Sequence, residues 1–181
     1  MATTLPLKHI IQVMNAIQSM PLGLRLLLHE TPERIELAKN RTLLRPGEMC
    51  DNLYYIEKGI LGSYEKDGHK RVYTWLMLPG DIATSVESFN MRVPAKEFVE
   101  TITDCTLHAL SWEKLQQFTE TYREFGTIRQ HLTDRYHLQA RNMDAQRKRT
   151  PEHFYDYLKK EYGDYLKLNP ISCSPPLWAF L

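Results

Sequence analysis

The sequence predicts an α+β fold that is mainly β, an antiparallel roll or jelly roll between helical segments. Short β-type runs separated by turn residues fill the stretch from about Arg34 to Ser111. Helical spacing of apolar residues precedes this stretch, and a proline-free helical pattern follows it. Short strands with turns roughly every 8 to 12 residues are typical of an antiparallel roll or sandwich.

The first element is a helical segment over residues 8–28. Ile10, Met14 and Ile17 fall on one face of a helix. Pro21 interrupts this pattern, because proline lacks the N–H that a helix interior needs. We therefore expect the segment to break there and to restart.

Turn signals divide the roll into strands. Arg45-Pro46-Gly47, Lys58-Gly59 and Pro79-Gly80-Asp81 are predicted turns. Asp67-Gly68 is the strongest hairpin signal, because a type I′ turn needs two residues that tolerate positive φ. The predicted strands include residues 35–37, 53–56, 60–64, 72–76, 98–102 and 105–110.

A long helix is predicted after the roll. Ser111 is a good N-cap, although Lys114 replaces the Glu of a capping box. Gly126 is expected to mark the break between a short helix and a long one over residues 124–148, which would be ~37 Å long. The apolar stripe of the long helix is narrow, like a coiled-coil seam, and this favours a two-chain partner. The predicted dimer interface is Phe125, Ile128, Leu132 and Tyr136.

A further helix is expected from Thr150-Pro151-Glu152, which supplies a cap, a proline at the first position and an acid in the first turn. Ser174-Pro175-Pro176 begins another one. That last helix would hold only Leu177–Leu181, and an uncapped apolar end of this kind looks cut off.

Composition excludes several classes of protein. Apolar residues make up 43% of the 181 residues, charged ones 25%, and the net charge is +1. This is normal for a soluble globular chain and atypical of a strongly basic nucleic-acid binder. No apolar run approaches the roughly 20 residues that span a bilayer. We expect a cytoplasmic protein with no membrane association.

Cysteines, histidines and catalytic motifs indicate neither a metal site nor an enzyme. Cys50, Cys105 and Cys173 lie far apart, so reduced and mostly buried thiols are expected. His131 and His137 are about 120° apart on a helix and cannot bind one metal together. The spacings of cupins, P-loops, G-x-S-x-G hydrolases and G-x-G-x-x-G folds do not occur.

The order of elements resembles the Crp/Fnr family of bacterial transcription regulators. The stretch "LLRPGEMCDNLYYIEKGILGSYEKDGHKRVYTWLMLPGD" (43–81) is similar to that family's L-x-x-G-E-x-x-D-x-L-Y-x-I-x-x-G run, its hairpin and its P-G-D turn. Glu87-Ser88-Phe89 resembles a segment of the compact Bacteroidetes regulators. The resemblance implies a cyclic-nucleotide-binding-type β-roll (1–121), a dimerisation helix (122–149) and the start of an apparently truncated winged helix-turn-helix domain (150–181).

The resemblance also locates a phosphate cassette, the segment that holds the phosphate in relatives that bind cyclic AMP. There a Glu accepts from the ribose hydroxyl, and an Arg followed by Ser or Thr binds the phosphate. Without gaps these positions fall on Ser85, Ala95 and Lys96, so the key pair is absent. Lys96 supplies only a point charge, and Arg92 is the alternative cation. The candidate pocket is Gly80, Asp81, Ser85, Val86, Glu87, Ser88, Pro94, Ala95 and Lys96.

These features predict the effector-sensing and dimerisation part of a Crp/Fnr-like regulator that is not a physiological cyclic AMP binder. No cofactor is assigned, and the small-molecule effector is unidentified. The chain is expected to form a homodimer, and to bind DNA if the C-terminal domain is complete. Residues 150–181 carry net −1 and are by themselves a poor DNA surface. The alternatives are a stand-alone ligand-binding or protein-interaction module, and a degenerate sensor without a ligand.

Overall fold

The computed structural model describes residues 7–68 and 70–163. The chain divides into two compact units, Met1–His131 and Leu132–Leu181. The first contains all the strands of the described ranges and the second contains most of the long helix. The two units are described one at a time.

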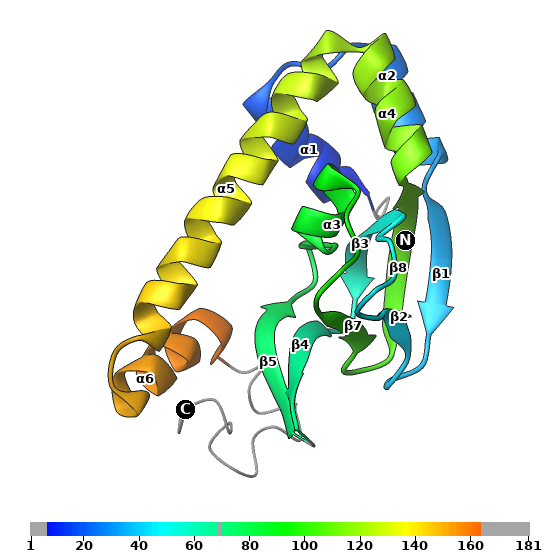
Figure 1. Ribbon diagram of the computed structural model, residues 1–181. Coiled ribbons are helices and arrows are strands. Elements are labelled where there is room, and N and C mark those ends of the chain that lie inside the picture. Colours follow the sequence, from blue (N-terminus) through cyan, green and yellow to red (C-terminus); the bar gives the residue numbers. More distant parts are fainter. Residues whose placement is uncertain (1–6, 69, 164–181) are drawn as a thin grey trace, which may run out of the picture. The chain divides into compact units, whose positions relative to one another are not determined.

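Two four-stranded antiparallel sheets form the first unit (Figure 1). One has the order β1-β8-β3-β6 and the other the order β2-β7-β4-β5. This arrangement confirms the predicted α+β fold with an antiparallel β-roll. The strands are β1 (Glu33–Leu37), β2 (Thr42–Leu44), β3 (Asn52–Lys58), β4 (Leu61–Asp67), β5 (Lys70–Met77), β6 (Ile82–Ala83), β7 (Phe98–Thr101) and β8 (Cys105–Ser111).

The core of the roll takes side chains from both sheets. Ile56 and Leu107 from one sheet, and Leu61 and Thr101 from the other, are fully buried. Sequence-distant strands are neighbours: Ile56 on β3 lies opposite Leu107 on β8, and Leu61 on β4 lies opposite Thr101 on β7. The fold therefore depends on pairings between strands that are far apart along the chain.

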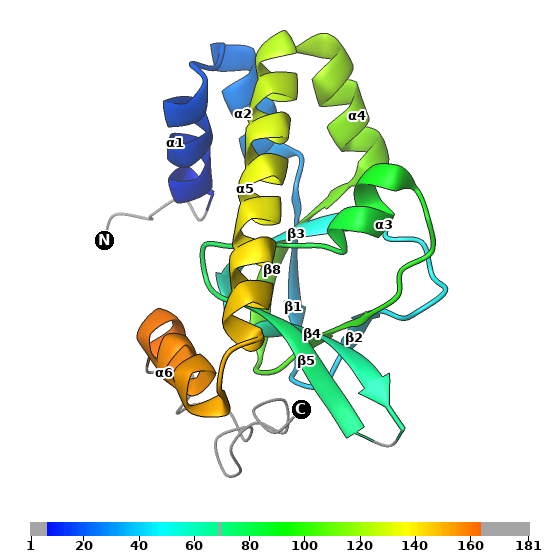
Figure 2. The ribbon, with the colours of Figure 1, turned by 60° about the vertical axis from the view of Figure 1, so that its left-hand side comes forward.

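The predicted hairpin is confirmed, with a shift of one residue. β4 and β5 run side by side as one hairpin (Figure 2). Asp67 is still in the strand and pairs with Lys70, and Gly68 has a φ of 59°. Gly68 thus supplies the positive φ that the sequence indicated, but Asp67 does not belong to the turn.

Among the described residues, four helices and the start of a fifth complete the first unit. Helix α1 (Lys8–Ile17) ends before Pro21, and α2 (Leu22–Glu30) begins directly after it, as predicted. The hydroxyl of Ser111 accepts a hydrogen bond from the N–H of Lys114 at the start of α4 (Trp112–Thr121), which confirms the predicted N-cap. The short helix α3 (Val86–Met91) lies between β6 and β7.

The break before the long helix is not at Gly126, so that prediction was wrong. Tyr122 has extended φ and ψ angles of −126° and 108°, and α5 (Arg123–Arg147) begins immediately after it. Gly126 lies inside α5. The rings of Phe118 and Phe125 pack edge to face across the break, with centroids 5.8 Å apart. Tertiary packing of these aromatic side chains, and not local glycine flexibility, accompanies the turn.

The second unit contains the remainder of α5 and helix α6 (Pro151–Tyr162). The hydroxyl of Thr150 accepts from the N–H of His153, so the cap predicted for this helix is confirmed. The amide of Asn142 donates to the hydroxyl of Tyr157 at 3.3 Å, which joins α5 to α6. The helix predicted after Ser174-Pro175-Pro176 lies outside the described residues.

Candidate functional site

The turn before the predicted cassette is held by backbone geometry. Gly80 has a φ of 96°, and its N–H donates to the carbonyl of Ile56 at 2.8 Å. The carboxylate of Asp81 accepts from the N–H of Leu78 at 2.8 Å, while burial raises the pKa of this carboxyl above its usual value. The backbone N–H of Gly80 and the side chain of Asp81 therefore both stabilise the turn.

Helix α3 occupies the centre of the cassette. Ser85 is its N-cap residue, and Phe89 and Ser88 are buried on its inner face. Glu87 lies in the first turn, where a carboxylate interacts favourably with the helix dipole. Glu87 therefore has a structural role at the start of α3.

The cation and the anion predicted for the pocket bind each other. The ammonium of Lys96 lies 3.0 Å from both carboxylate oxygens of Glu87, and 70% of the Lys96 side chain is exposed. Pro94 is exposed as well. Lys96 therefore offers a surface charge that is already paired, and such a charge contributes little to anion affinity.

The position aligned with the phosphate-binding arginine is a buried alanine. Ala95 is 5% exposed. Its N–H donates to the carbonyl of Glu48 at 2.8 Å, and its carbonyl accepts from the N–H of Gly47 at 2.9 Å. These two backbone hydrogen bonds join the cassette to the loop between β2 and β3. The alanine side chain provides no positive charge at this position.

Arg92 binds the same loop and not the centre of the cassette. It ends α3 in the left-handed region, with a φ of 55°. Its guanidinium donates to the carbonyl of Cys50 at 2.8 Å and to the carboxylate of Asp51, and it lies 4.8 Å from the ring centroid of Trp112. An approach to a phosphate in the cassette would cost Arg92 all three contacts.

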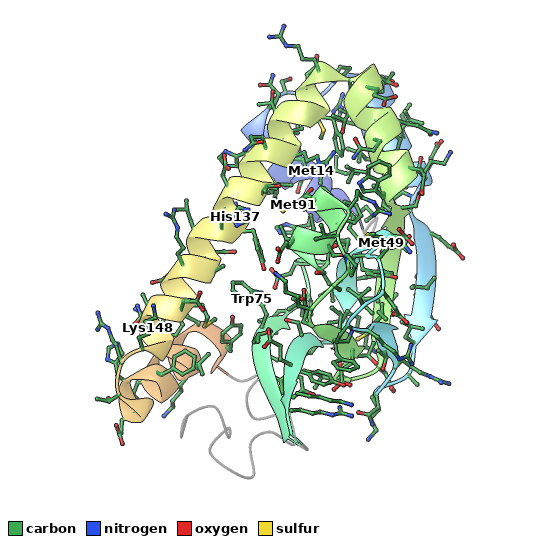
Figure 3. All side chains as sticks on the ribbon, in the orientation of Figure 1. Met14, Met49, Trp75, Met91, His137 and Lys148 are labelled. Atoms are coloured by element: carbon green, nitrogen blue, oxygen red, sulfur yellow. The ribbon has the colours of Figure 1, made fainter. Side chains whose placement is uncertain are left out.

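A cavity of about 410 Å³ lies between the β2–β3 loop and the roll. The N–H of Cys50 donates to the hydroxyl of Ser88 at 3.0 Å, which holds the loop against α3. Figure 3 labels Met49 on this loop and Met91 on α3. The cavity is lined by Leu43, Leu44, Glu48, Met49, Cys50, Asp51, Asn52, Tyr54, Thr84, Ser85 and Val99.

Of the nine residues predicted for the pocket, the lining of this cavity includes Ser85. The predicted pocket as a whole stays a prediction. Sequence reasoning missed Leu43, Leu44 and Val99, whose apolar character indicated only core, and it missed the loop from Glu48 to Asn52. The G-E-x-x-D run around this loop was the available signal, but it was used only for the family resemblance.

Two cysteine thiols and the phenol of Tyr54 are buried or half-buried in the first unit. Cys50 and Cys105 are buried free cysteines, as expected, while Cys173 lies outside the described residues. Burial raises the pKa of the Tyr54 phenol and of the Cys105 thiol.

In residues 7–68 and 70–163, no group of three or more His, Cys, Asp or Glu side chains is placed to hold a metal ion. None of the helices in these ranges combines the length and hydropathy of a membrane span.

The four residues of the predicted dimer seam differ in their surroundings. Phe125 and Ile128 are buried and belong to the first unit. Leu132 and Tyr136 are half-buried and belong to the second. The seam stays a prediction, and it depends mainly on the latter pair.

The fold and the sequence agree on the class of domain. Residues 34–122 match the family model described as cyclic nucleotide-binding domain. This segment runs from β1 to the end of α4, so the match covers the whole roll. The fold is therefore that of the cyclic-nucleotide-binding-type β-roll, followed by the long helix α5.

Solved structures extend this likeness beyond the roll. A transcriptional regulator of the crp/fnr family from Eubacterium rectale is 12% identical, with a TM-score of 0.65, and the match covers 82% of this chain and 69% of that one. The c-di-GMP responsive global regulator CLP of Xanthomonas campestris is 19% identical, with a TM-score of 0.58 and coverage of 83% and 74%.

The regulatory domain of Toxoplasma gondii PKA, crystallised with cAMP, is 14% identical with a TM-score of 0.53. That match covers 61% of this chain, which spans only 43% of the Toxoplasma chain. At these identities the likeness shows a shared fold. No curated protein matches the chain.

Proposed function

We propose that this chain is the effector-sensing and dimerisation part of a Crp/Fnr-like transcription regulator. The observation that carries the proposal is the succession of a cyclic-nucleotide-binding-type roll, the 25-residue helix α5 and the capped helix α6. Two of the similar structures are described as regulators, one of them from the crp/fnr family. Residues 150–181 are the start of the winged helix-turn-helix domain in this proposal, and Glu87-Ser88-Phe89 favours a Bacteroidetes-like member.

The mechanism is a two-state one. An effector bound in the roll has different affinities for two dimer geometries, and this difference shifts the population between them. The complete C-terminal domains would then be presented to, or withheld from, successive grooves of DNA. The protein acts in the cytoplasm, as a homodimer and without enzymatic activity.

Dimerisation is tested by Leu132→Asp. A charge in the seam must be buried or must separate the helices, so the variant is expected to be a monomer of 21.3 kDa by light scattering, while the wild type has twice that mass. Leu138→Asp is the matched control, because Leu138 lies on the same helix and is exposed. A dimeric Leu132→Asp variant with native circular dichroism would refute this seam.

Cyclic AMP is not the effector in this proposal. Ala95 replaces the bidentate cation, and Lys96 and Arg92 are both paired with carboxylates. Losing a charge-assisted bidentate contact removes about 3 kcal/mol, or two decades of affinity. Titration calorimetry of the wild type is expected to give a Kd for cyclic AMP of about 1 mM or weaker, and Lys96→Ala should change it less than about threefold. A Kd near or below ~10 μM would overturn this part of the proposal.

A further inference from the structure

The side chain of Ser85 forms no hydrogen bond with any of the described residues. The residue is 2% exposed, and its side chain does not cap α3. Other buried serines of the roll are satisfied: Ser63 is bonded to Thr74 at 3.0 Å, and Ser88 accepts from Cys50. The hydroxyl of Ser85 is therefore free to donate to, or accept from, water or a ligand.

The hydroxyl of Ser85 lies in the wall of the 410 Å³ cavity. The buried side chains of Leu44, Cys50 and Val99 form part of the same wall. Thr84 and Asn52 add polar groups, and both already bond within the site, the hydroxyl of Thr84 to the carbonyl of Asn52. A cavity of this size, lined by apolar and polar groups in similar proportion, can hold a small molecule.

The charges around the cavity exclude an anion. Among the residues that line it, Glu48 and Asp51 are acidic and none is Lys or Arg. Each acid has its own cation outside the lining: Arg45 lies 3.6 Å from Glu48, and Arg92 binds Asp51. An anionic ligand would therefore approach two carboxylates without a free cation, while a cationic ligand would find both acids already compensated.

We propose that this cavity binds a small uncharged molecule with an apolar body, which hydrogen-bonds to the hydroxyl of Ser85. The apolar body lies against Leu44 and Val99, and the polar group of the ligand meets Ser85. The proposal rests on the effector-sensing function proposed above and names the chemical class of the effector. It moves the site from the phosphate positions of the cassette to the cavity beneath the β2–β3 loop.

The test uses benzyl alcohol, benzoate and benzylamine as probes, because they share one apolar body and differ in charge. The full chain is labelled with ¹³C at the methionine methyl groups and observed by NMR. Met49 lines the cavity, and Met91 on α3 is 70% exposed and does not (Figure 3). We expect benzyl alcohol to shift the Met49 signal and to leave the Met91 signal in place. Benzoate and benzylamine should bind at least about tenfold more weakly.

Two variants and a matched control assign the contact. Ser85→Ala should lower the affinity for benzyl alcohol about three- to tenfold, the usual effect of losing one hydrogen bond. Ser63→Ala is the matched control, a buried serine that does not line the cavity, and it should change the affinity less than about twofold. Leu43→Trp fills the cavity from a half-buried position and should abolish the Met49 shift, whether or not Ser85→Ala folds.

Three outcomes would overturn the proposal: an unmoved Met49 signal at ~20 mM benzyl alcohol, tighter binding of benzoate or benzylamine, or an unchanged affinity in folded Ser85→Ala. Each would leave the regulator proposal to be judged by light scattering of the dimer. Conversely, a monomeric wild type would refute the dimeric regulator and would leave the cavity result intact.

Discussion

Gly59→Ala is expected to lower the free energy of unfolding by about 4 kcal/mol. Gly59 has a φ of 94°, a conformation that an L-residue adopts only with strain. A Cβ at this position would also collide with the carbonyl oxygen of Asp104 and with the Cα and Sγ of Cys105. Backbone atoms of a paired strand cannot move aside as a flexible side chain can. Urea unfolding followed by circular dichroism would measure the loss.

Gly47→Ala is the control that separates strain from collision. Gly47 has nearly the same φ, 89°, but a Cβ there would meet nothing within 4 Å. Its cost should be about 1 kcal/mol, from the backbone conformation alone. Equal losses in the two variants would contradict a close approach between Gly59 and the β7–β8 connection.

Arg92→Ala is expected to destabilise the first unit by about 3 kcal/mol and to loosen the β2–β3 loop. The substitution removes the hydrogen bond to the carbonyl of Cys50, the ion pair with Asp51 and the contact with the ring of Trp112. The ion pair is partly exposed, so its share is small and should fall further at high salt. Thermal unfolding and hydrogen exchange at residues 48–52 would measure the two effects.

Two further substitutions separate the contributions to the loss of stability expected in Arg92→Ala. Arg92→Gly removes the same contacts but relieves the left-handed conformation, so it should be about 1 kcal/mol less destabilised than Arg92→Ala. Lys96→Ala breaks an exposed pair and should cost less than about 1 kcal/mol. If Lys96→Ala costs as much as Arg92→Ala, the link between α3 and the loop is not what holds this region.

Much of the roll could be predicted from local signals. Gly68 and Gly80 have the positive φ that their turns require, and Ser111 and Thr150 cap the helices that they precede. Residue identity alone also indicated that the cassette lacks its phosphate-binding arginine, because Ala95 has no charge in any fold.

Other elements had no local signal. β6 has two residues, too few for a period, and it exists because Tyr54 and Tyr55 on β3 pair with it. The short β2 pairs with β7 across an irregular register. The helix break at Tyr122 was assigned to Gly126, because helix propensity does not report how Phe118 packs on Phe125.

By itself the sequence determined the kind of fold, an antiparallel roll with a long helix, and the absence of the usual anion-binding pair. Turn conformations, caps and the charge of a side chain are properties of single residues and their close neighbours. Only the tertiary structure decided that Arg92 binds Asp51 and that Ser85 lies without a bond in a cavity beside Val99. These contacts join segments that are far apart along the chain, and they form only when the two sheets close into the roll.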